Sequence, residues 1–307
     1  MRIFVTGSNS HLALALLPKL CAHPAIERVI GIDIRPTLFR HDKFEARAMD
    51  VRDAQFGALL PGCDALIHLA FVVLQGRMDP RSMHRINVGA SQALFDAAAA
   101  AGVQRLVHLS SASVYGSGEE LAEAAPLAPL AGFLYARHKA KLEAWLEAHH
   151  PRAVRLRAHV VLGPNAQPLL RWLVRQPCHI LLPDPQPLLQ CVHEEDVADA
   201  IVLALFNGQA SGPYNLAAPQ TFSFREMIAR HRGATLPLPM FLARIGLKSA
   251  WKLFGIGGEP AWVEGLARPL TLDCSRARRE LAWQPRFSAW EAIDAARDGG
   301  QQPSRPA

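Results

Sequence analysis

The sequence predicts an α/β protein built on a doubly wound parallel sheet, followed by a smaller C-terminal region. In the first half, short runs rich in β-branched residues alternate with longer Ala/Leu-rich amphipathic segments, as in repeated βαβ units. The first run ends in a glycine loop that leads directly into a helical segment. After Gly163 the alternation fades and prolines become frequent, which indicates a different, loop-rich organisation.

Six strands and four helices are predicted in the first half of the chain. The strands fall at residues 2–6, 28–33, 45–49, 65–69, 105–110 and 153–157. The helices fall at residues 11–21, 53–60, 81–101 and 133–149. Because crossovers between parallel strands are right-handed, these units wind the sheet into the doubly wound form.

The predicted core covers residues 1–163, with later segments returning to it, and residues 164–298 form mainly a cap. Further helices are expected at 193–206 and 224–231. The apolar segment 236–266 is rich in Trp and Phe, and its part 236–262 is interpreted as cap core rather than as a ligand slot. Residues 299–307 have the composition of a disordered tail.

Composition and charge argue against several classes of protein. The chain has 307 residues, 50% of them hydrophobic, and a formal net charge of +6. The basic residues are scattered, and the dense run 276–279 is interpreted as a solvated helix face, so no nucleic-acid partner is expected. The five cysteines lie far apart without a C-x-x-C pair, which predicts no metal site and fits a reducing cytoplasm. No apolar run is long enough to span a membrane.

The loop after the first strand has the features of a dinucleotide-binding turn. Gly7 would make the tight turn and Ala13 is small enough for helix packing, whereas Ser10 stands where a second glycine is expected. The Ser10 hydroxyl and N–H can still reach a phosphate at a helix N-terminus, although its Cβ would push the pyrophosphate outward. The alternative is an ordinary strand-to-helix turn. The predicted cofactor-binding residues of this loop are Gly7, Ser8, Asn9, Ser10, His11 and Leu12.

Acidic residues at the next two strand ends favour NAD over NADP. Asp33 ends the second strand, where a carboxylate accepts both ribose hydroxyls of NAD and repels a 2′-phosphate. Arg35 and Arg52 keep NADP open as an alternative, because guanidinium groups bind phosphate. Asp50 and Val51 would lie against the adenine; alternatively, Asp33 is a solvated acid and Asp50 caps the helix that begins at Asp53.

Tyr135 and Lys139 form the predicted catalytic group together with Ser111. Tyr135 and Lys139 are four residues apart in a helical segment, so they share one face. A neighbouring ammonium and a positive nicotinamide ring would lower the phenol pKa toward neutrality, making Tyr135 a general acid or base. Lys139 could also hold the nicotinamide ribose. Ser111 follows a central strand and would polarise the substrate oxygen.

In this order, the motifs resemble those of extended short-chain dehydrogenase/reductases of the NAD-dependent epimerase/dehydratase type. The resemblance implies a Rossmann-type core with a substrate-capping region, dinucleotide contacts from Leu69 and Ala70, and a homodimer. It also places Asn87 on a helix near the active site; alternatively, Asn87 satisfies backbone groups in its own helix. The motifs are the Thr6-Gly7 loop, Asp33, Asp50-Val51, His68-Leu69-Ala70, Asn87, Ser110-Ser111, Val114-Tyr115-Gly116, Tyr135 with Lys139, Gly163-Pro164, Val192-His193 with Asp196-Val197, Tyr214-Asn215-Leu216 and residues 273–285.

Two departures from that family bear on the substrate. Nucleotide-sugar members usually carry an asparagine where this chain has Val160, and an arginine where it has Leu188, Leu189 and Gln190. Burying a diphosphate among apolar side chains is unfavourable, so the sequence favours an NAD(P)-dependent oxidoreductase acting on a hydroxyl or keto compound of low polarity. The first alternative is a nucleotide-sugar epimerase or dehydratase, with phosphate contacts from Arg171 or Arg268. The second is a non-catalytic dinucleotide-binding redox sensor.

Overall fold

The computed structural model describes residues 1–35, 37–76, 78–182, 184–232, 235–254 and 261–299. Over these residues the main sheet has seven parallel strands in the order β12-β7-β5-β4-β1-β2-β3. From β1 the chain adds β2 and β3 on one side, and then returns to add β4, β5, β7 and β12 on the other side of β1. This reversal in strand order is that of a doubly wound Rossmann-type sheet, so the predicted fold class is confirmed. The strands are β1 (Arg2–Thr6), β2 (Arg28–Asp33), β3 (Phe44–Ala48), β4 (Ala65–His68), β5 (Arg105–Leu109), β7 (Val154–Ala158) and β12 (Gly212–Leu216).

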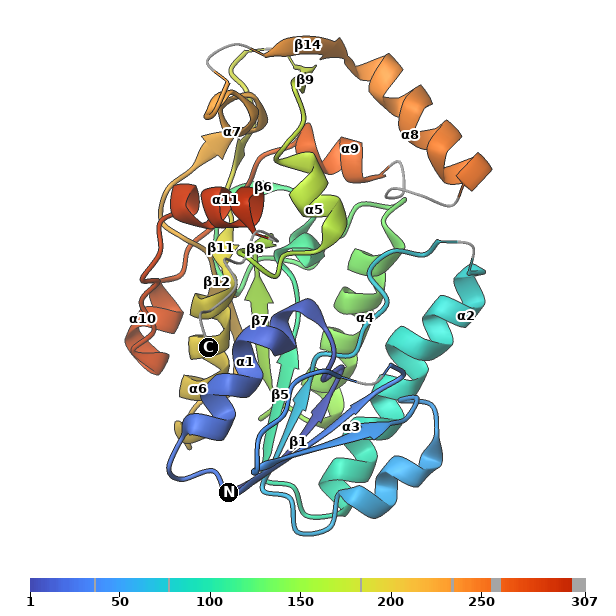
Figure 1. Cartoon of the computed structure of the whole chain (residues 1–307), viewed down its shortest axis with the longest axis vertical. Helices are drawn as coiled ribbons and strands as arrows, with labels where there is room; N and C mark the ends of the chain where they lie inside the picture. The colour runs from blue at the N-terminus through green and yellow to red at the C-terminus, as the bar shows by residue number, and fades with distance from the viewer. Residues whose placement is uncertain (36, 77, 183, 233–234, 255–260, 300–307) are drawn as a thin grey trace, which may run out of the picture.

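Helices cover both faces of this sheet (Figure 1). On one face, α1 (His11–Ala22), α6 (Glu194–Phe206) and α10 (Ser275–Leu281) pack over an apolar cluster that contains Ile3, Val5 and Ile67. On the other, α3 (Ser91–Ala100) and α4 (Leu134–His149) pack over Phe4 and Leu66. Successive residues of a strand therefore point into two separate apolar cores, one on each face, because a parallel sheet is covered by helices on both sides.

The six predicted strands are confirmed to within a residue at each end, but the seventh was missed. β12 begins with Gly212 and Pro213, two residues that are untypical of strands. Pro213 is tolerated because β12 pairs only with β7 and forms the edge of the sheet. The segment after Gly163 thus contributes a strand to the core.

The predicted helix at 81–101 consists of three segments instead of one. α2 (Pro80–His84) is followed by a π-helical turn, η2 (Arg85–Ala90), and then by α3. The predicted helix at 53–60 is a 3₁₀ helix, η1 (Ala54–Leu59). π-Helical turns inside helices are frequent at functional sites, and this one contains Asn87.

Most of the remaining elements form the C-terminal region around a third apolar cluster, which includes Leu162, Ile180, Phe224 and Ile293. The short helix 112–115 instead packs in the first cluster, with Ile3 and Val5. A four-stranded sheet has the order β13-β10-β15-β6, and two pairs of strands, β11-β8 and β14-β9, complete the strands of the described chain. The strands are β6 (Gly118–Leu121), β8 (Val161–Leu162), β9 (Cys178–Leu181), β10 (Leu188–Leu189), β11 (Val192–His193), β13 (Phe222–Ser223), β14 (Leu236–Pro239) and β15 (Leu270–Leu272). The helices are η3 (Ala112–Tyr115), α5 (Pro168–Leu173), α7 (Phe224–Ala229), α8 (Met240–Phe254), α9 (Ala261–Leu266) and α11 (Ala289–Asp298).

Three interpretations of this half need correction. Among the described residues of the stretch 236–262, Phe241 and Ile245 of α8 are exposed and therefore do not belong to the cap core. The predicted tail begins too early, since Gly299 is buried and its carbonyl accepts a hydrogen bond from Arg171; residues 300–307 lie outside the described residues. Arg276 is more than a solvated residue, because its guanidinium donates to the carbonyls of Ser211 and Pro213.

Candidate functional site

Three side chains spaced four residues apart on α4 meet the carboxyl end of β5. The spacing places Tyr135, Lys139 and Glu143 on one face of the helix. This face packs where β5 leaves the sheet and enters η3, so consecutive residues of the strand end are all contacted. In the order given, the partners are the Ser111 side chain, the Leu109 carbonyl oxygen and the Ser110 hydroxyl.

Tyr135 and Ser111 share a hydrogen bond between their side chains. The Ser111 hydroxyl oxygen also accepts from the Ser113 N–H at 3.2 Å and from the Ser113 hydroxyl at 2.9 Å. Because Ser111 accepts from Ser113, its own proton is available to Tyr135 or to an oxygen placed beside it. The predicted pair is therefore brought into direct contact.

The pKa of Tyr135 departs from the sequence-based expectation. Burial raises it to about 12, and the hydrogen bond with Ser111 opposes that rise only in part. The expected lowering by Lys139 is not seen, because the Lys139 ammonium lies 5.8 Å from the centroid of the Tyr135 ring and donates to Leu109 instead. In this structure Tyr135 is thus a neutral phenol at physiological pH.

Lys139 is almost fully buried beneath Phe71. Its Nζ lies 3.7 Å from the centroid of the Phe71 ring, a cation–π distance, and donates to the Leu109 carbonyl. Burial lowers the pKa of Lys139 well below its ordinary value, while the negative charge of Glu143 raises it. The ring of Phe71 also meets that of Tyr135 edge-on, with centroids 5.6 Å apart.

A buried ion pair behind this group was not predicted from the sequence. Glu143 on α4 accepts from Arg157 on β7, whose Nε and Nη2 lie 2.9 and 2.7 Å from Oε2. Arg157 Nη1 in turn donates to the Tyr115 hydroxyl at 2.6 Å, and Tyr115 donates to Asn215 at 2.8 Å. The signal available was Glu143 itself, four residues beyond Lys139 on the same helix face. This network ties α4 to β7, to η3 and to β12.

The loop between β1 and α1 approaches the end of β4 so closely that Gly7 is required. Gly7 has a φ of +72°, and a Cβ there would lie 2.6 Å from the backbone nitrogen of Ala70. It would also lie 2.9 Å from the carbonyl carbon of Leu69. The predicted dinucleotide contacts Gly7, Leu69 and Ala70 are therefore adjacent in space, although they belong to two strand ends.

Ser10 has a structural reason to stand at the position expected for a second glycine. It is the N-cap of α1, and its hydroxyl accepts from the Ala13 N–H at 3.4 Å. Its φ of −74° is one that any residue adopts. Asn9 donates its N–H to the Asp33 carboxylate at 3.0 Å, while Ser8 and Leu12 are buried. The loop is thus tied to the end of β2.

His11 at the start of α1 faces charges from both halves of the chain. Its pKa is lowered by partial burial and then by the positive charges of Arg35 and Arg171. Arg171 belongs to α5, so the C-terminal region brings a cation to the helix N-terminus. The Nε atom of Arg171 is buried and has no hydrogen-bond partner among the described residues.

The residues expected at the adenosine end lie around the ends of β2 and β3. The second carboxylate oxygen of Asp33 accepts from the Arg35 N–H at 3.0 Å. Asp50 forms an ion pair with Arg52 at 2.6 Å, which holds the pKa of that carboxyl below its ordinary value. Asp50 is not the helix cap considered above, since Asp53 itself caps η1. Val51 is buried beside them.

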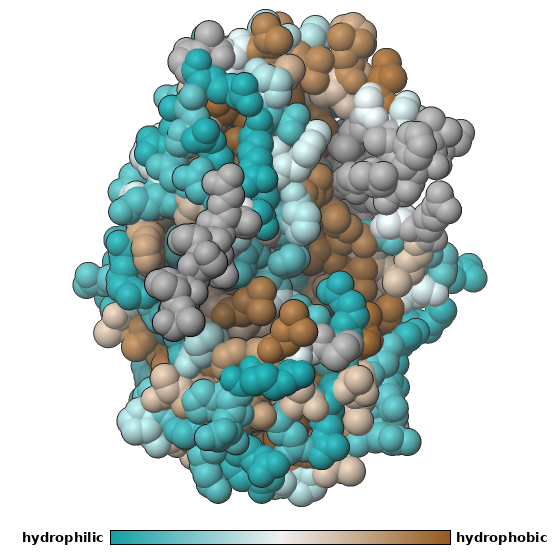
Figure 2. Space-filling view, viewed as in Figure 1, coloured by the Kyte–Doolittle hydropathy of each residue, from teal (hydrophilic) through white to brown (hydrophobic). Residues whose placement is uncertain are grey.

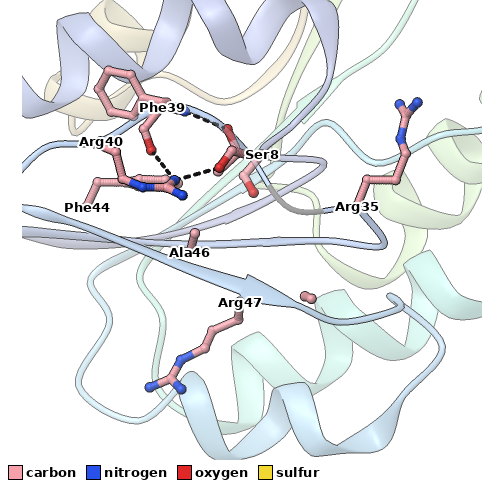
Figure 3. Close-up of a pocket in the computed structure, with 9 residues that line it drawn as sticks. Ser8, Arg35, Phe39, Arg40, Phe44, Ala46 and Arg47 are labelled. Carbon is pink, nitrogen blue, oxygen red and sulfur yellow. Dashed lines mark hydrogen bonds between the residues drawn. The ribbon is translucent and has the colours of Figure 1, made fainter.

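A cavity of about 400 Å³ adjoins this end of the site and shares Ser8 with the loop. Arg40 lies across it and donates to the carbonyls of Thr37 and Phe39, whereas Arg35 and Arg47 extend away from Ser8 (Figure 3). The lining residues are Ser8, Arg35, Thr37, Phe39, Arg40, Phe44, Ala46, Arg47 and Ala48.

Asn87 holds the loop that follows β4. Its side chain accepts from the Val72 N–H at 2.7 Å and donates to the Val72 carbonyl at 2.9 Å. The alternative that Asn87 satisfies its own helix is therefore wrong: its partner is the loop that carries Phe71. His68 below this loop bonds to Thr6 and Ser91, at 2.7 and 2.8 Å, and burial lowers its pKa to about 3.

Residues 3–217 match the NAD-dependent epimerase/dehydratase family, a stretch that contains the loop, the strand ends and α4. The chain belongs to this family. It is an enzyme of the NAD-dependent epimerase/dehydratase type, and NAD is its cofactor. The predicted resemblance is thus confirmed, and a non-catalytic sensor is set aside. In the described chain no helix is both long and apolar enough to cross a membrane.

Curated and solved relatives of this family member include enzymes with different substrates. It is 28% identical to a 4-hydroxy-2-methyl-3-oxo-4-farnesyl-3,4-dihydroquinoline-1-oxide ketoreductase of Stigmatella aurantiaca, over 98% of this chain and 97% of the relative. It is 27% identical to a UDP-glucose 4-epimerase of Mycolicibacterium smegmatis, over 95% and 96%. Its fold matches the Thermus thermophilus UDP-glucose 4-epimerase complex with NAD with a TM-score of 0.76, at 22% identity over 98% and 100% of the two chains.

Buried neutral histidines around the site predict a loss of stability in acid. His108 lies beside His68, and its two ring nitrogens are buried without partners in the described structure. Burial lowers its pKa well below 6.5. As the pH falls below about 6.5, the unfolded state binds a proton that the folded state excludes, which at pH 5 costs about 2 kcal/mol for one such histidine.

We therefore expect His108→Leu to reduce the acid sensitivity of this family member. Its free energy of unfolding should fall less than that of the wild type between about pH 7 and pH 5. Urea titrations at several pH values measure this difference. If the free energy of unfolding depended on pH in the same way in both proteins, the assignment of His108 as a neutral buried group would be contradicted.

Proposed function

We propose that the protein is an NAD-dependent oxidoreductase that interconverts a ketone and a secondary alcohol of low polarity. The observation that carries the proposal is the convergence of Ser111, Tyr135 and Lys139 at the carboxyl end of β5. Tyr135 can donate a proton, the Ser111 hydroxyl can polarise a carbonyl oxygen, and Lys139 adds a cation. Together these groups can transfer a proton beside a reacting carbonyl.

The β1–α1 loop fits a dinucleotide. Gly7 leaves the space that a Cβ would fill, and the free N–H groups at the start of α1 suit a pyrophosphate. Residues 7–12 would hold the pyrophosphate, and Asp33 would bind the adenosine ribose. Asp50 and Val51 would contact the adenine. Leu69 and Ala70 would contact the dinucleotide from the end of β4. Lys139 and Tyr135 would lie at the nicotinamide ribose, and Asn87 acts by holding the loop of Phe71. When bound, NADH supplies the hydride that reduces the carbonyl carbon.

The side chains of Ser111 and Tyr135 polarise the carbonyl and supply the proton for its reduction. The Ser111 hydroxyl donates to the carbonyl oxygen, and Tyr135 passes its phenolic proton to that oxygen as negative charge develops there. Because burial raises the pKa of Tyr135 to about 12, the proton is present when the ketone arrives. In the reverse direction Tyr135 accepts the alcohol proton as a tyrosinate, which the hydrogen bond from Ser111 stabilises.

Apolar residues around the site support a substrate of low polarity. Val160 and Leu188 are both exposed, at positions where polar partners of a sugar nucleotide were expected. Gln190 is unavailable as a substitute, since it donates to the Ala218 carbonyl and accepts from the Leu272 N–H. Figure 2 shows hydrophobic surface lining the hollow beside α4. The Stigmatella aurantiaca ketoreductase, named for a farnesyl-bearing ketone, supports the same class of substrate.

The decisive experiment is a substrate screen with purified protein. We expect NADH-dependent reduction of ketones that carry isoprenoid or other aliphatic chains, followed at 340 nm, a standard absorbance of NADH. Interconversion of UDP-glucose and UDP-galactose without net NADH consumption would instead establish an epimerase. That second candidate rests on the epimerase relatives and on the unpartnered Arg171 Nε, which could meet a phosphate.

The preference for NAD over NADP is proposed to rest on Asp33. Its oxygens accept from the backbone at residues 9 and 35, which fixes a negative charge where the adenosine ribose would lie. We expect Asp33→Asn to weaken NAD binding and strengthen NADP binding, changing the ratio of dissociation constants by about tenfold or more. Calorimetric titration of both cofactors measures the ratio. An unchanged ratio would mean that other residues select the cofactor.

A further inference from the structure

The end of the C-terminal region farthest from the main sheet exposes large apolar side chains. We call it the apolar tip, and it is built from β9, β14 and α8, at the top of Figure 1. Leu236 is 65% exposed, Phe241 62% and Ile245 58%. Figure 2 shows hydrophobic surface over β14 and the start of α8. The residues of the apolar tip are Leu181, Leu236, Phe241, Leu242 and Ile245.

The described side chains at the start of α8, residues 240–246, are arranged unusually for a helix at the surface of a globular protein. Its partly buried residues Met240 and Ala243 pack on the apolar cluster of the cap. The larger residues Phe241, Leu242 and Ile245 face solvent instead. A surface helix normally buries its most hydrophobic side, and a contiguous exposed apolar patch marks an interaction site. The apolar tip is therefore available to a partner.

The two chain segments that build the apolar tip carry only basic charges of their own, and acidic residues of neighbouring segments pair with two of these cations, Arg230 with Asp294 at 2.8 Å and Arg244 with Glu264 at 3.7 Å. Neither the segment 168–182 nor the segment 227–258 of the sequence contains an Asp or a Glu. Basic residues occur throughout both segments, and within α8 they follow one another at intervals of four positions. Those of α8 are Arg244, Lys248 and Lys252, and Arg175, Arg230 and Arg232 lie elsewhere in the two segments, whereas Arg171 lies near His11 at the start of α1 and not at the tip.

We propose that the apolar tip docks the protein on an anionic membrane surface. A helix with exposed Phe, Leu and Ile and with only basic charges combines apolar insertion with attraction to anionic headgroups. A second copy of this chain is a poorer occupant, because a symmetric contact through the same patch would bring the α8 cations of both copies together.

This inference goes beyond the proposed oxidoreductase activity and does not depend on it. If the substrate carries a long aliphatic chain, it resides in the bilayer, and docking brings the cap to it. Lipid binding is measured without substrate, so a failure of the activity and a failure of the docking can be told apart.

The test is co-sedimentation of the full chain with two kinds of vesicle. One contains only phosphatidylcholine, and the other also contains phosphatidylserine. We expect binding to the mixed vesicles that weakens as salt is added, because the attraction is partly electrostatic. Phe241→Ser combined with Ile245→Ser should lower the partition coefficient by at least about tenfold. The matched control is Leu38→Ser, which removes an apolar side chain that is 91% exposed but lies between β2 and β3.

Three outcomes would overturn the proposal. They are no sedimentation with either vesicle, equal partitioning of the double variant, and an equal loss for the Leu38 control. A concentration-dependent dimer that the double variant abolishes, seen by sedimentation velocity without lipid, would assign the apolar tip to self-association. Unchanged NAD affinity in the double variant would show that its fold is intact.

Discussion

Replacing Tyr135 by Phe is expected to lower turnover by about 10²- to 10⁴-fold while leaving the affinity for NAD nearly unchanged. The substitution removes only the hydroxyl, so the ring contacts with Phe71 and Phe133 are kept. What is lost is the proton and the hydrogen bond to Ser111. Steady-state kinetics with the ketone found in the substrate screen, together with calorimetric titration of NAD, give the two values.

The chain offers a matched control in Tyr214. Its hydroxyl also takes part in hydrogen bonds, donating to Glu280 and accepting from the Ser211 N–H, but it lies on β12 at the sheet edge. Tyr214→Phe should retain wild-type turnover. Full activity in the Tyr135 variant would remove the proposed proton donor, whereas an equal loss in both variants would indicate a general effect on folding.

The raised pKa of Tyr135 also predicts how the two directions of the reaction depend on pH. Reduction needs the protonated phenol, which is present well above neutral pH because its pKa is about 12. Oxidation needs the tyrosinate, whose population grows with rising pH, so the oxidation rate should increase toward alkaline pH while the reduction rate stays flat near neutrality. Comparing kcat over pH in both directions measures this difference. An oxidation rate independent of pH would contradict the role of Tyr135 as the base.

Much of the fold could be predicted because the first half of the chain is locally consistent. Apolar β-branched runs and amphipathic helices alternate there, and Gly7 stands where the backbone approach of Ala70 permits no side chain. β12 could not be recognised, since its Gly212 and Pro213 are accepted only because it forms the sheet edge. The position of a strand at the edge of a sheet is a feature of the tertiary structure, and the local sequence pattern does not predict it.

The proximity of the candidate site residues could be predicted from the sequence, but their electrostatics could not. Spacing alone placed Tyr135 and Lys139 on one helix face. The direction of the Tyr135 pKa shift depends on burial and on Lys139 bonding to Leu109, and both result from packing. Likewise, Arg157 comes from a separate strand, so its pairing with Glu143 could not be read from local spacing.

That buried pair leads to the largest expected effect on stability. Arg157→Met should lower the free energy of unfolding by about 3–5 kcal/mol, because it leaves the Glu143 carboxylate buried without its main partner. Glu143 would keep the Ser110 hydroxyl and the more distant Arg155, whose Nε is 3.8 Å away. Neither replaces the three guanidinium hydrogen bonds that are lost. Denaturant unfolding measures the change.

The exposed pair between Arg230 and Asp294 is the control for this prediction. It is also a guanidinium–carboxylate pair, with two hydrogen bonds of 2.8 Å, but its side chains are about one-third exposed to solvent. Arg230→Met should therefore cost less than about 1 kcal/mol. Removing both buried partners, Glu143→Leu with Arg157→Met, should recover part of the stability, because no carboxylate is left unpaired. If Arg157→Met costs no more than Arg230→Met, burial does not control the strength of this pair, and the network cannot be what holds α4 against β5 and β7.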